Sequence, residues 1–228
     1  MRSVAPVLGV DGCRAGWVGA LLVGDDVELV VVPTIAALLA AVLTRPAAVG
    51  IDIPIGLPDT GPRQADVLAR RELPVGRKSS VFPTPARAAV SATSWQEATE
   101  ENRRATGKGL SHQGFNLCRK IAEVDAWVRG EPGVPVLEVH PEVSFTVMGA
   151  DTVPSKKLLE GREIRRAALL ASGLRLPEVR RTAAYEVDDL LDACAVAWTT
   201  RRHVAGDSRR LPDPPEVFSD GLMAAIHV

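Results

Sequence analysis

Cysteine and aromatic residues are scarce in this chain of 228 residues, which contains three cysteines, one tyrosine, four phenylalanines and four tryptophans. Cys13, Cys118 and Cys194 lie far apart and form no Cys-x-x-Cys pair, so neither a disulfide framework nor a zinc knuckle is expected. Each cysteine is predicted to be a small buried apolar residue. The few aromatic residues are scattered, and no stacking platform for nucleic-acid bases is predicted from them.

Long apolar runs are also missing from the sequence. The longest segment without a charged residue covers 29–44, which is 16 residues, and it contains Pro33, whereas a membrane-spanning helix needs about 20 apolar residues. Asp11 interrupts the N-terminal apolar segment before a secretory signal could be complete. We therefore expect no membrane association and a cytoplasmic location.

Net charge is the third property that is nearly absent, because 27 Lys and Arg balance 28 Asp and Glu. The two signs are nevertheless separated along the chain. Residues 59–130 carry 12 basic against 8 acidic side chains, and residues 155–181 carry 8 against 3. These excesses of +4 and +5 indicate where a phosphate-bearing ligand could bind, although each basic residue taken singly is better explained as part of a solvated surface.

Apolar periodicity and turn residues divide the chain into strands and helices. The segments predicted to be extended are, in chain order, 7–11, 17–23, 27–32, 48–53, 135–140 and 221–228. The segments predicted to be helical are 35–43, 63–71, 95–105, 113–128, 155–172 and 185–203. Residues 54–112 form a long excursion rich in proline, glycine and charge, which in a compact domain is more often functional or mobile than structural. Residues 207–215 are predicted to be a polar loop.

The first three predicted strands are joined by short turns and therefore form an antiparallel meander. Later strands are reached through helices, which makes parallel pairing natural. The chain is thus predicted to be one α/β domain over 1–228, with a mixed sheet of three antiparallel strands followed by parallel strands and with helices on both faces. This order of elements is typical of the ribonuclease H-like architecture.

Acidic residues occur near the carboxyl ends of several predicted strands. Asp11 and Asp52 each follow a glycine by two residues, so each shares a strand face with that glycine. Glu138 and His140 likewise share a face of the strand over 135–140. Ligands of open α/β sheets gather at the carboxyl ends of strands, and converging carboxylates need a cation to offset their repulsion. Taken singly, each acid could instead cap a turn.

A second acidic group, Asp188, Asp189 and Asp192, lies on the helix predicted over 185–203. Asp192 can share a ligand with either of the other two, because residues three or four apart lie on one side of a helix. Helical-wheel geometry puts Asp189 and Asp192 opposite the large apolar stripe, which is the arrangement of solvent-facing acids. The same face continues into small apolar residues, which favours packing against a sheet, and both interpretations stay open.

In combination, these segments resemble the ribonuclease H-like nuclease superfamily, and the spacing of the helical acids is closest to its Holliday-junction resolvase branch. More narrowly, the chain is similar to the family called domain of unknown function 429, whose members are predicted RNase H-like nucleases. The segments that carry the resemblance are 9–13, 50–58, 138–142, 155–157 and 188–193. They follow one another in order and extend over nearly the full chain.

The resemblance implies a carboxylate site for two metal ions. Asp11 would bridge the two ions, and Asp52 would be the ligand from the fourth strand. Asp189 or Asp192 would complete the site from the last helix. Asp52 stands where the resolvases have glutamate, so its shorter side chain changes the reach to the metal.

The expected activity is metal-dependent hydrolysis of phosphodiester bonds in DNA or RNA. Two divalent ions activate a water molecule and stabilise the leaving oxygen, and ligands that offer only oxygen suit Mg²⁺ or Mn²⁺. Additional candidates for this site are Glu138, His140 and Asp188. Candidates for contacts with the phosphates of a nucleic-acid partner are Lys156, Lys157, Arg77 and Lys78.

Two other interpretations stay open. An actin-like or sugar-kinase-like phosphotransferase or ATPase shares the strand order and a Gly-x-Asp-Gly turn after the first strand. The turn over 11–16 lacks a hydroxyl residue for phosphate, however, and no second Asp-x-Gly-Thr loop follows. The other interpretation is a nucleic-acid-binding module that keeps the fold without catalysis, which the complete acid set disfavours. The kind of nucleic acid and the oligomeric state stay open at this point.

Overall fold

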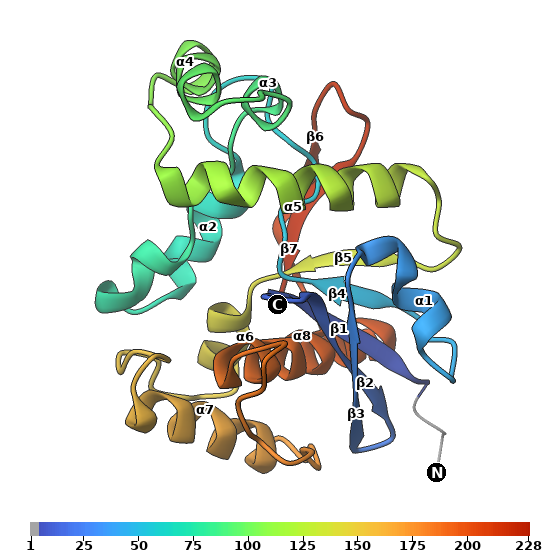
Figure 1. Cartoon of the computed structure of the whole chain (residues 1–228). Coiled ribbons are helices and arrows are strands. Elements are labelled where there is room, and N and C mark those ends of the chain that lie inside the picture. Colours follow the sequence, from blue (N-terminus) through green and yellow to red (C-terminus); the bar gives the residue numbers. More distant parts are fainter. Residues whose placement is uncertain (1–4) are drawn as a thin grey trace.

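One mixed sheet organises residues 5–228, the part of the chain that the computed structural model describes (Figure 1). Its seven strands lie in the order β3-β2-β1-β4-β5-β7-β6. The first three strands are antiparallel neighbours, β1, β4, β5 and β7 run parallel, and β6 returns antiparallel to β7. The strands are β1 (Val7–Cys13), β2 (Gly16–Val23), β3 (Asp26–Val32), β4 (Val49–Ile51), β5 (Val136–Val139), β6 (Arg210–Val217) and β7 (Met223–His227).

Helices cover both faces of this sheet (Figure 1). On one face α5 and the short α1 pack near Val10, Trp17 and Leu21, and on the other face α6, α7 and α8 pack near Val18 and Ala20. The predicted mixed α/β class is therefore confirmed, and the arrangement is consistent with an RNase H-like fold. The helices are η1 (Ile35–Ala37), α1 (Leu38–Ala41), α2 (Gln64–Glu72), η2 (Val75–Ser80), α3 (Arg87–Val90), α4 (Trp95–Thr106), α5 (His112–Arg129), α6 (Pro141–Val147), α7 (Leu159–Ala171) and α8 (Val187–Ala205).

Helix α8 lies closer to the sheet than side chains would normally allow. A Cβ atom added to Gly9 would lie 2.1 Å from the backbone nitrogen of Ala197, and one added to Gly50 would lie 2.1 Å from Oγ1 of Thr200. Unbonded atoms cannot approach so closely, so both positions require glycine. The backbone of Ala193 also borders Gly9, so small residues on α8 and glycines on β1 and β4 together produce this contact.

The excursion over 54–112 folds back over the carboxyl ends of the central strands. It contains α2, η2, α3 and α4 and returns to the sheet through α5. Its side chains and carbonyl groups contact residues that end β5 or directly follow it. These contacts include Arg63 with Glu138, Ser80 with His140 and Arg77 with Glu142.

The C-terminal region differs from its prediction. Residues 207–215, expected to be a loop, contain most of β6, and β7, expected at an edge, lies inside the sheet between β5 and β6. The three prolines of β6 are tolerated because an edge strand needs fewer backbone donors. Its pairing with β7 is irregular between Leu211 and Glu216.

Two further boundaries bear on the site. The helix predicted over 155–172 begins only at Leu159, so residues 155–157 lie in a loop. Pro141 occupies the first turn of α6, where its missing N–H has no helical partner to lose. Within residues 5–228 no helix has the length and apolar character needed to cross a membrane.

Candidate active site

The two Gly-x-Asp segments lie side by side at the carboxyl ends of β1 and β4. The parallel register pairs Gly9 with Gly50, and the backbone N–H of Asp52 donates to the carbonyl oxygen of Val10 at 3.0 Å. Side chains alternate along a strand, so Asp11 and Asp52 lie on the face that the two glycines occupy. That face is the one covered by α8. The structure thus places both carboxylates together, as their spacing predicts.

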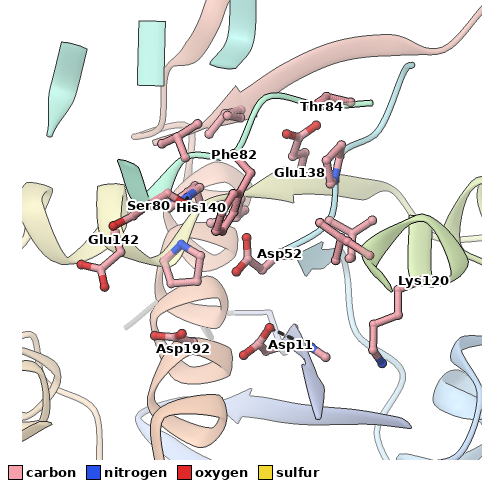
Figure 2. Close-up of a pocket in the computed structure, with 18 of the residues that line it drawn as sticks. Asp11, Asp52, Ser80, Phe82, Thr84, Lys120, Glu138, His140, Glu142 and Asp192 are labelled. Atoms are coloured by element: carbon pink, nitrogen blue, oxygen red, sulfur yellow. Dashed lines mark hydrogen bonds between the residues drawn. The ribbon is translucent and has the colours of Figure 1, made fainter. Parts of the chain in front are cut away.

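Helix α8 brings a third carboxylate to this place. Asp192 is fully buried, and it lies at one end of the α8 surface that contacts the sheet. Figure 2 shows Asp11, Asp52 and Asp192 grouped around one hollow. Asp188 is buried as well, because α8 is enclosed on nearly all sides. The interpretation of these helix acids as solvent-facing is therefore wrong for Asp188 and Asp192.

Asp189 lies in the same pocket but has a local partner. Its Oδ2 accepts a hydrogen bond from the backbone N–H of Glu186 at 2.9 Å, which completes a capping box at the start of α8. Its side chain is half-buried and lines the pocket. Of the two helix acids that the resemblance offers as ligands, Asp192 is thus the one whose carboxylate takes no part in the capping box.

The grouped carboxylates disturb one another's ionisation. Burial raises the pKa of Asp11 well above its usual range, and the charges of Asp52 and Asp192 add to this rise. Burial also raises the pKa of Asp52 to about 6, although the charge of His140 opposes the rise. Burial raises the pKa of Asp192 despite the opposing charge of Lys156. Like charges held together in a poorly solvated place favour a bound cation.

Two lysines from the loop before α7 supply positive charge to these acids. Nζ of Lys156 donates to Oδ2 of Asp192, and Nζ of Lys157 donates to Oδ2 of Asp188 at 2.7 Å. Burial lowers the pKa of Lys156, but the surrounding carboxylates, Asp192 first, outweigh burial and raise it. Both lysines, predicted as phosphate contacts, therefore contact acids in this structure. The second oxygens, Oδ1 of Asp188 and Oδ1 of Asp192, are buried without a hydrogen-bond partner among the described residues.

The other two predicted phosphate contacts differ from each other. Arg77 lines the pocket, and its Nη2 donates to Oε1 of Glu142 at 2.8 Å. Glu142 also accepts a hydrogen bond from the buried Arg165 at 2.7 Å. Lys78 is exposed and lies outside the pocket lining. A ligand in the pocket would thus meet Arg77 rather than Lys78.

Glu138 and His140 lie on the pocket wall. The oxygens of Glu138 accept hydrogen bonds from Arg63 at 2.5 and 2.9 Å, and this buried ion pair accounts for the burial of Glu138 without a metal ion. Nε2 of His140 lies 3.3 Å from the carbonyl oxygen of Ser80. Nδ1 of His140 is buried with no partner in residues 5–228, and the ring lies on the same side of the pocket as Asp52 (Figure 2).

These side chains surround a cavity of about 580 Å³. The acids of β1, β4 and α8 form its floor, and the excursion together with α5 forms its wall. The α5 residues in the wall are spaced by three or four positions and thus share one face of the helix. The wall residues from α5 and from the excursion include Gln113, Asn116, Leu117, Lys120, Phe82 and Thr84.

The order of segments along the chain has a counterpart in a known family. The sequence model of the family described as protein of unknown function (DUF429) matches residues 9–217. The chain belongs to the DUF429 family. The match extends from β1 to the end of β6 and includes every acid at the floor of the pocket. No curated protein and no solved structure matches the chain.

The donor chemistry of this DUF429 site fits a hard divalent cation. Its donors are carboxylate oxygens, and Oδ1 of Asp192 is buried and unpartnered among the described residues. As positioned, no group of three His, Cys, Asp or Glu side chains in residues 5–228 surrounds one ion, and the ammonium group of Lys156 lies against Asp192. A cation shared with Asp11 and Asp52 must therefore use Oδ1 of Asp192 or displace Lys156 from Oδ2.

Several pocket residues of this family member were not predicted from the sequence. Phe82 lies in the excursion, which has no regular apolar spacing, so its position depends on contacts with distant residues. Glu142, Gln113 and Asn116 carry no motif that sets them apart from other polar residues on helices. The one sequence signal for this wall is the length of the excursion that follows Asp52.

Proposed function

We propose that this protein is a metal-dependent nuclease that hydrolyses phosphodiester bonds of DNA or RNA and uses Mg²⁺ or Mn²⁺. The observation that carries the proposal is the grouping of Asp11, Asp52 and Asp192 at the floor of one pocket. The oxygen-only donor set, the raised pKa values and the unpartnered oxygen of Asp192 support a divalent cation there. Lys156 and Arg77 line the same pocket and carry the charge that a phosphate group requires.

The residues of the pocket have distinct tasks in this proposal. When bound, a pair of divalent ions stabilises the attacking and leaving oxygens of a phosphodiester. The three grouped carboxylates would hold these ions. Lys156 favours the ionised form of Asp192, and Arg77 attracts the phosphate group. His140 lines the pocket on the same side as Asp52, where an imidazole can accept a proton from water or return one to the leaving oxygen.

Replacing Asp11 with asparagine tests the proposal most directly. Wild type and Asp11→Asn are incubated with labelled single-stranded, duplex, hybrid and four-way-junction substrates in the presence of Mn²⁺. We expect the wild type to cleave at least one substrate and the variant to cleave it at least about 100-fold more slowly, because an amide is a poor replacement for a bridging carboxylate. Thermal melts establish that the variant is folded.

Asp207→Asn is the matched control, since it makes the same change at an exposed acid outside the pocket lining. It should cleave at the wild-type rate. Equal cleavage by Asp11→Asn would refute the proposal and point to a contaminating nuclease. Metal-dependent ATP turnover without cleavage would favour the kinase-like interpretation, and salt-sensitive binding without cleavage would favour a binding module.

A further inference from the structure

The pocket is more enclosed than contact with a nucleic-acid backbone requires. Its volume of about 580 Å³ falls in the range of about 300–1,000 Å³ that is typical of sites enclosing one small molecule. A base that remains paired and stacked in a duplex cannot enter such a site, and enzymes that act on single bases first take them out of the stack. A ligand that fills this pocket must therefore be a single unpaired unit.

Phe82 gives the pocket an aromatic surface on a fixed backbone. Its side chain lines the cavity and is 45% exposed. On one side of it, Arg70 donates two hydrogen bonds to the carbonyl oxygen of Val81, at 2.9 and 2.8 Å. On the other side, the N–H of Thr84 donates to Oδ2 of Asp66 at 2.7 Å. An exposed ring on an anchored backbone loses little conformational freedom when a planar ligand stacks against it.

Helix α5 adds polar groups of the kind that base edges need. Gln113 and Asn116 lie about one turn apart, are exposed and line the pocket. Each carboxamide offers both a donor and an acceptor, which is the combination found along the edges of nucleobases. In Figure 2, Phe82 lies above Asp52, whereas Asp11 lies below it. The aromatic part of the pocket and its acidic part thus occupy different ends.

We propose that the pocket binds a single nucleotide unit whose base is unpaired, with the phosphate toward Asp11, Asp52 and Asp192 and the base against Phe82. The unit can come from a single-stranded segment or from a free nucleotide, because both present the same phosphate, sugar and base. The phosphate end of this arrangement rests on the proposed function. The base end rests on the pocket wall alone.

Calorimetric titrations of the full chain in Mg²⁺ separate the base from the phosphate. The ligands are the four nucleoside 5′-monophosphates and ribose 5-phosphate, which has no base. We expect at least one monophosphate to bind at least about tenfold more tightly than ribose 5-phosphate, because a base stacks favourably on an aromatic side chain. Phe82→Ala should reduce this preference to below about threefold and leave the affinity for ribose 5-phosphate unchanged.

Leu43→Ala is the control for the loss of an exposed apolar side chain. Leu43 is 98% exposed and lies outside the pocket lining, so this variant should keep the preference for the base. Phe82→Ala should melt at the wild-type temperature, since the ring it removes is already exposed. An unchanged preference in folded Phe82→Ala, or no preference in the wild type, overturns the proposal.

Labelled oligonucleotides distinguish the two sources of the nucleotide. Tighter binding of a single strand than of a blunt duplex of equal length, by at least about tenfold, supports the single-stranded source. Binding of the monophosphate alone supports the free nucleotide. Equal binding of single strand and duplex, or binding of neither the single strand nor the monophosphate, overturns the proposal. The cleavage assay with Asp11→Asn is independent, because a base preference can exist in a protein that cleaves nothing.

Discussion

The floor of the pocket and its wall are held in place by different interactions. At the floor, β1, β4 and α8 meet at Gly9 and Gly50 with no side chain from either glycine between them. The wall consists largely of the excursion over 54–112, which is fastened by buried ion pairs such as that between Arg63 and Glu138. The floor therefore depends on shape and the wall on the pairing of charges, so each can be disrupted without directly changing the other.

This difference suits the tasks that the two regions have in the proposed function. Groups that take part in a reaction must be held within about 0.5 Å of their working positions, and backbone contact provides that precision for Asp11 and Asp52. The wall has the simpler task of selecting a ligand through Phe82 and exposed amides. A segment fastened by side chains can differ in sequence and still perform that task.

Replacing Gly9 with alanine should have the largest effect and should disrupt the floor. The added Cβ would lie 2.1 Å from the backbone nitrogen of Ala197, so α8 must move away from the sheet. We expect the free energy of unfolding in urea to fall by about 4 kcal/mol or more. Gly76→Ala is the control, because its Cβ would lie no closer than 3.9 Å to Val153, and it should change stability by less than about 0.5 kcal/mol. Wild-type stability in Gly9→Ala would contradict the close contact.

Replacing Arg63 with methionine should have the next largest effect and should disrupt the wall. Arg63 is fully buried, and its removal leaves Glu138 and Asp66 buried without their common partner. We expect a loss of about 3 kcal/mol in the free energy of unfolding. Hydrogen exchange should accelerate in residues 54–90, while the amides of β1 and β4 keep their protection.

The control for this prediction is Arg104→Met, which removes an exposed ion pair with Glu101. A surface pair of this kind contributes little, so the loss should stay below about 0.5 kcal/mol. If Arg63→Met weakened the protection of β1 and β4 as much as that of the excursion, floor and wall would be one cooperative unit.

The ionisation of Asp52 should have the smallest effect and should sharpen the description of the floor. Its pKa of about 6 in the folded protein lies above the ordinary value of 3.8. Its contribution to stability is therefore complete below about pH 4 and is lost as the pH rises through 6. With a metal chelator present, this group should make the wild type about 1 kcal/mol less stable at pH 8 than at pH 5, after allowance for partial exposure.

Urea unfolding of wild type and Asp52→Asn at both pH values checks this prediction, and the difference between the two proteins isolates the carboxyl group. Millimolar Mg²⁺ should raise the melting temperature of the wild type at pH 8, because a ligand that binds only the folded state stabilises it. Asp11→Asn should lack most of that rise. A pH dependence that is the same in both proteins would contradict the raised pKa.

The fold and half of the floor could be predicted from the sequence because they follow local rules. Short turns and helical connections leave few arrangements for the strands, and the period of two along a strand places Asp11 and Asp52 beside their glycines. A helical wheel could not decide whether Asp192 faces solvent. The answer depends on the burial of α8 on nearly all sides, which results from its contact with glycines on two distant strands.

The wall could not be predicted because its contacts join distant parts of the chain. Arg63 and Glu138 are 75 positions apart, and neither residue carries a motif that indicates the other. The same limit applies to β6, whose prolines predict a loop when only local preference is considered. Its place at the edge of the sheet, beside β7, removes the need for some of the backbone donors that proline lacks.

The glycine contacts also restrict how α8 can be displaced relative to the sheet. Sliding the helix by one residue moves it by about 1.5 Å and turns the contacting face by about 100°, which would bring side chains other than Ala193 and Ala197 over Gly9. Two contact points on neighbouring strands therefore fix both the axial position and the rotation of the helix. The distance from Asp192 to the strand ends is then a property of the whole scaffold, and a ligand that needed a different distance would have to bend the sheet.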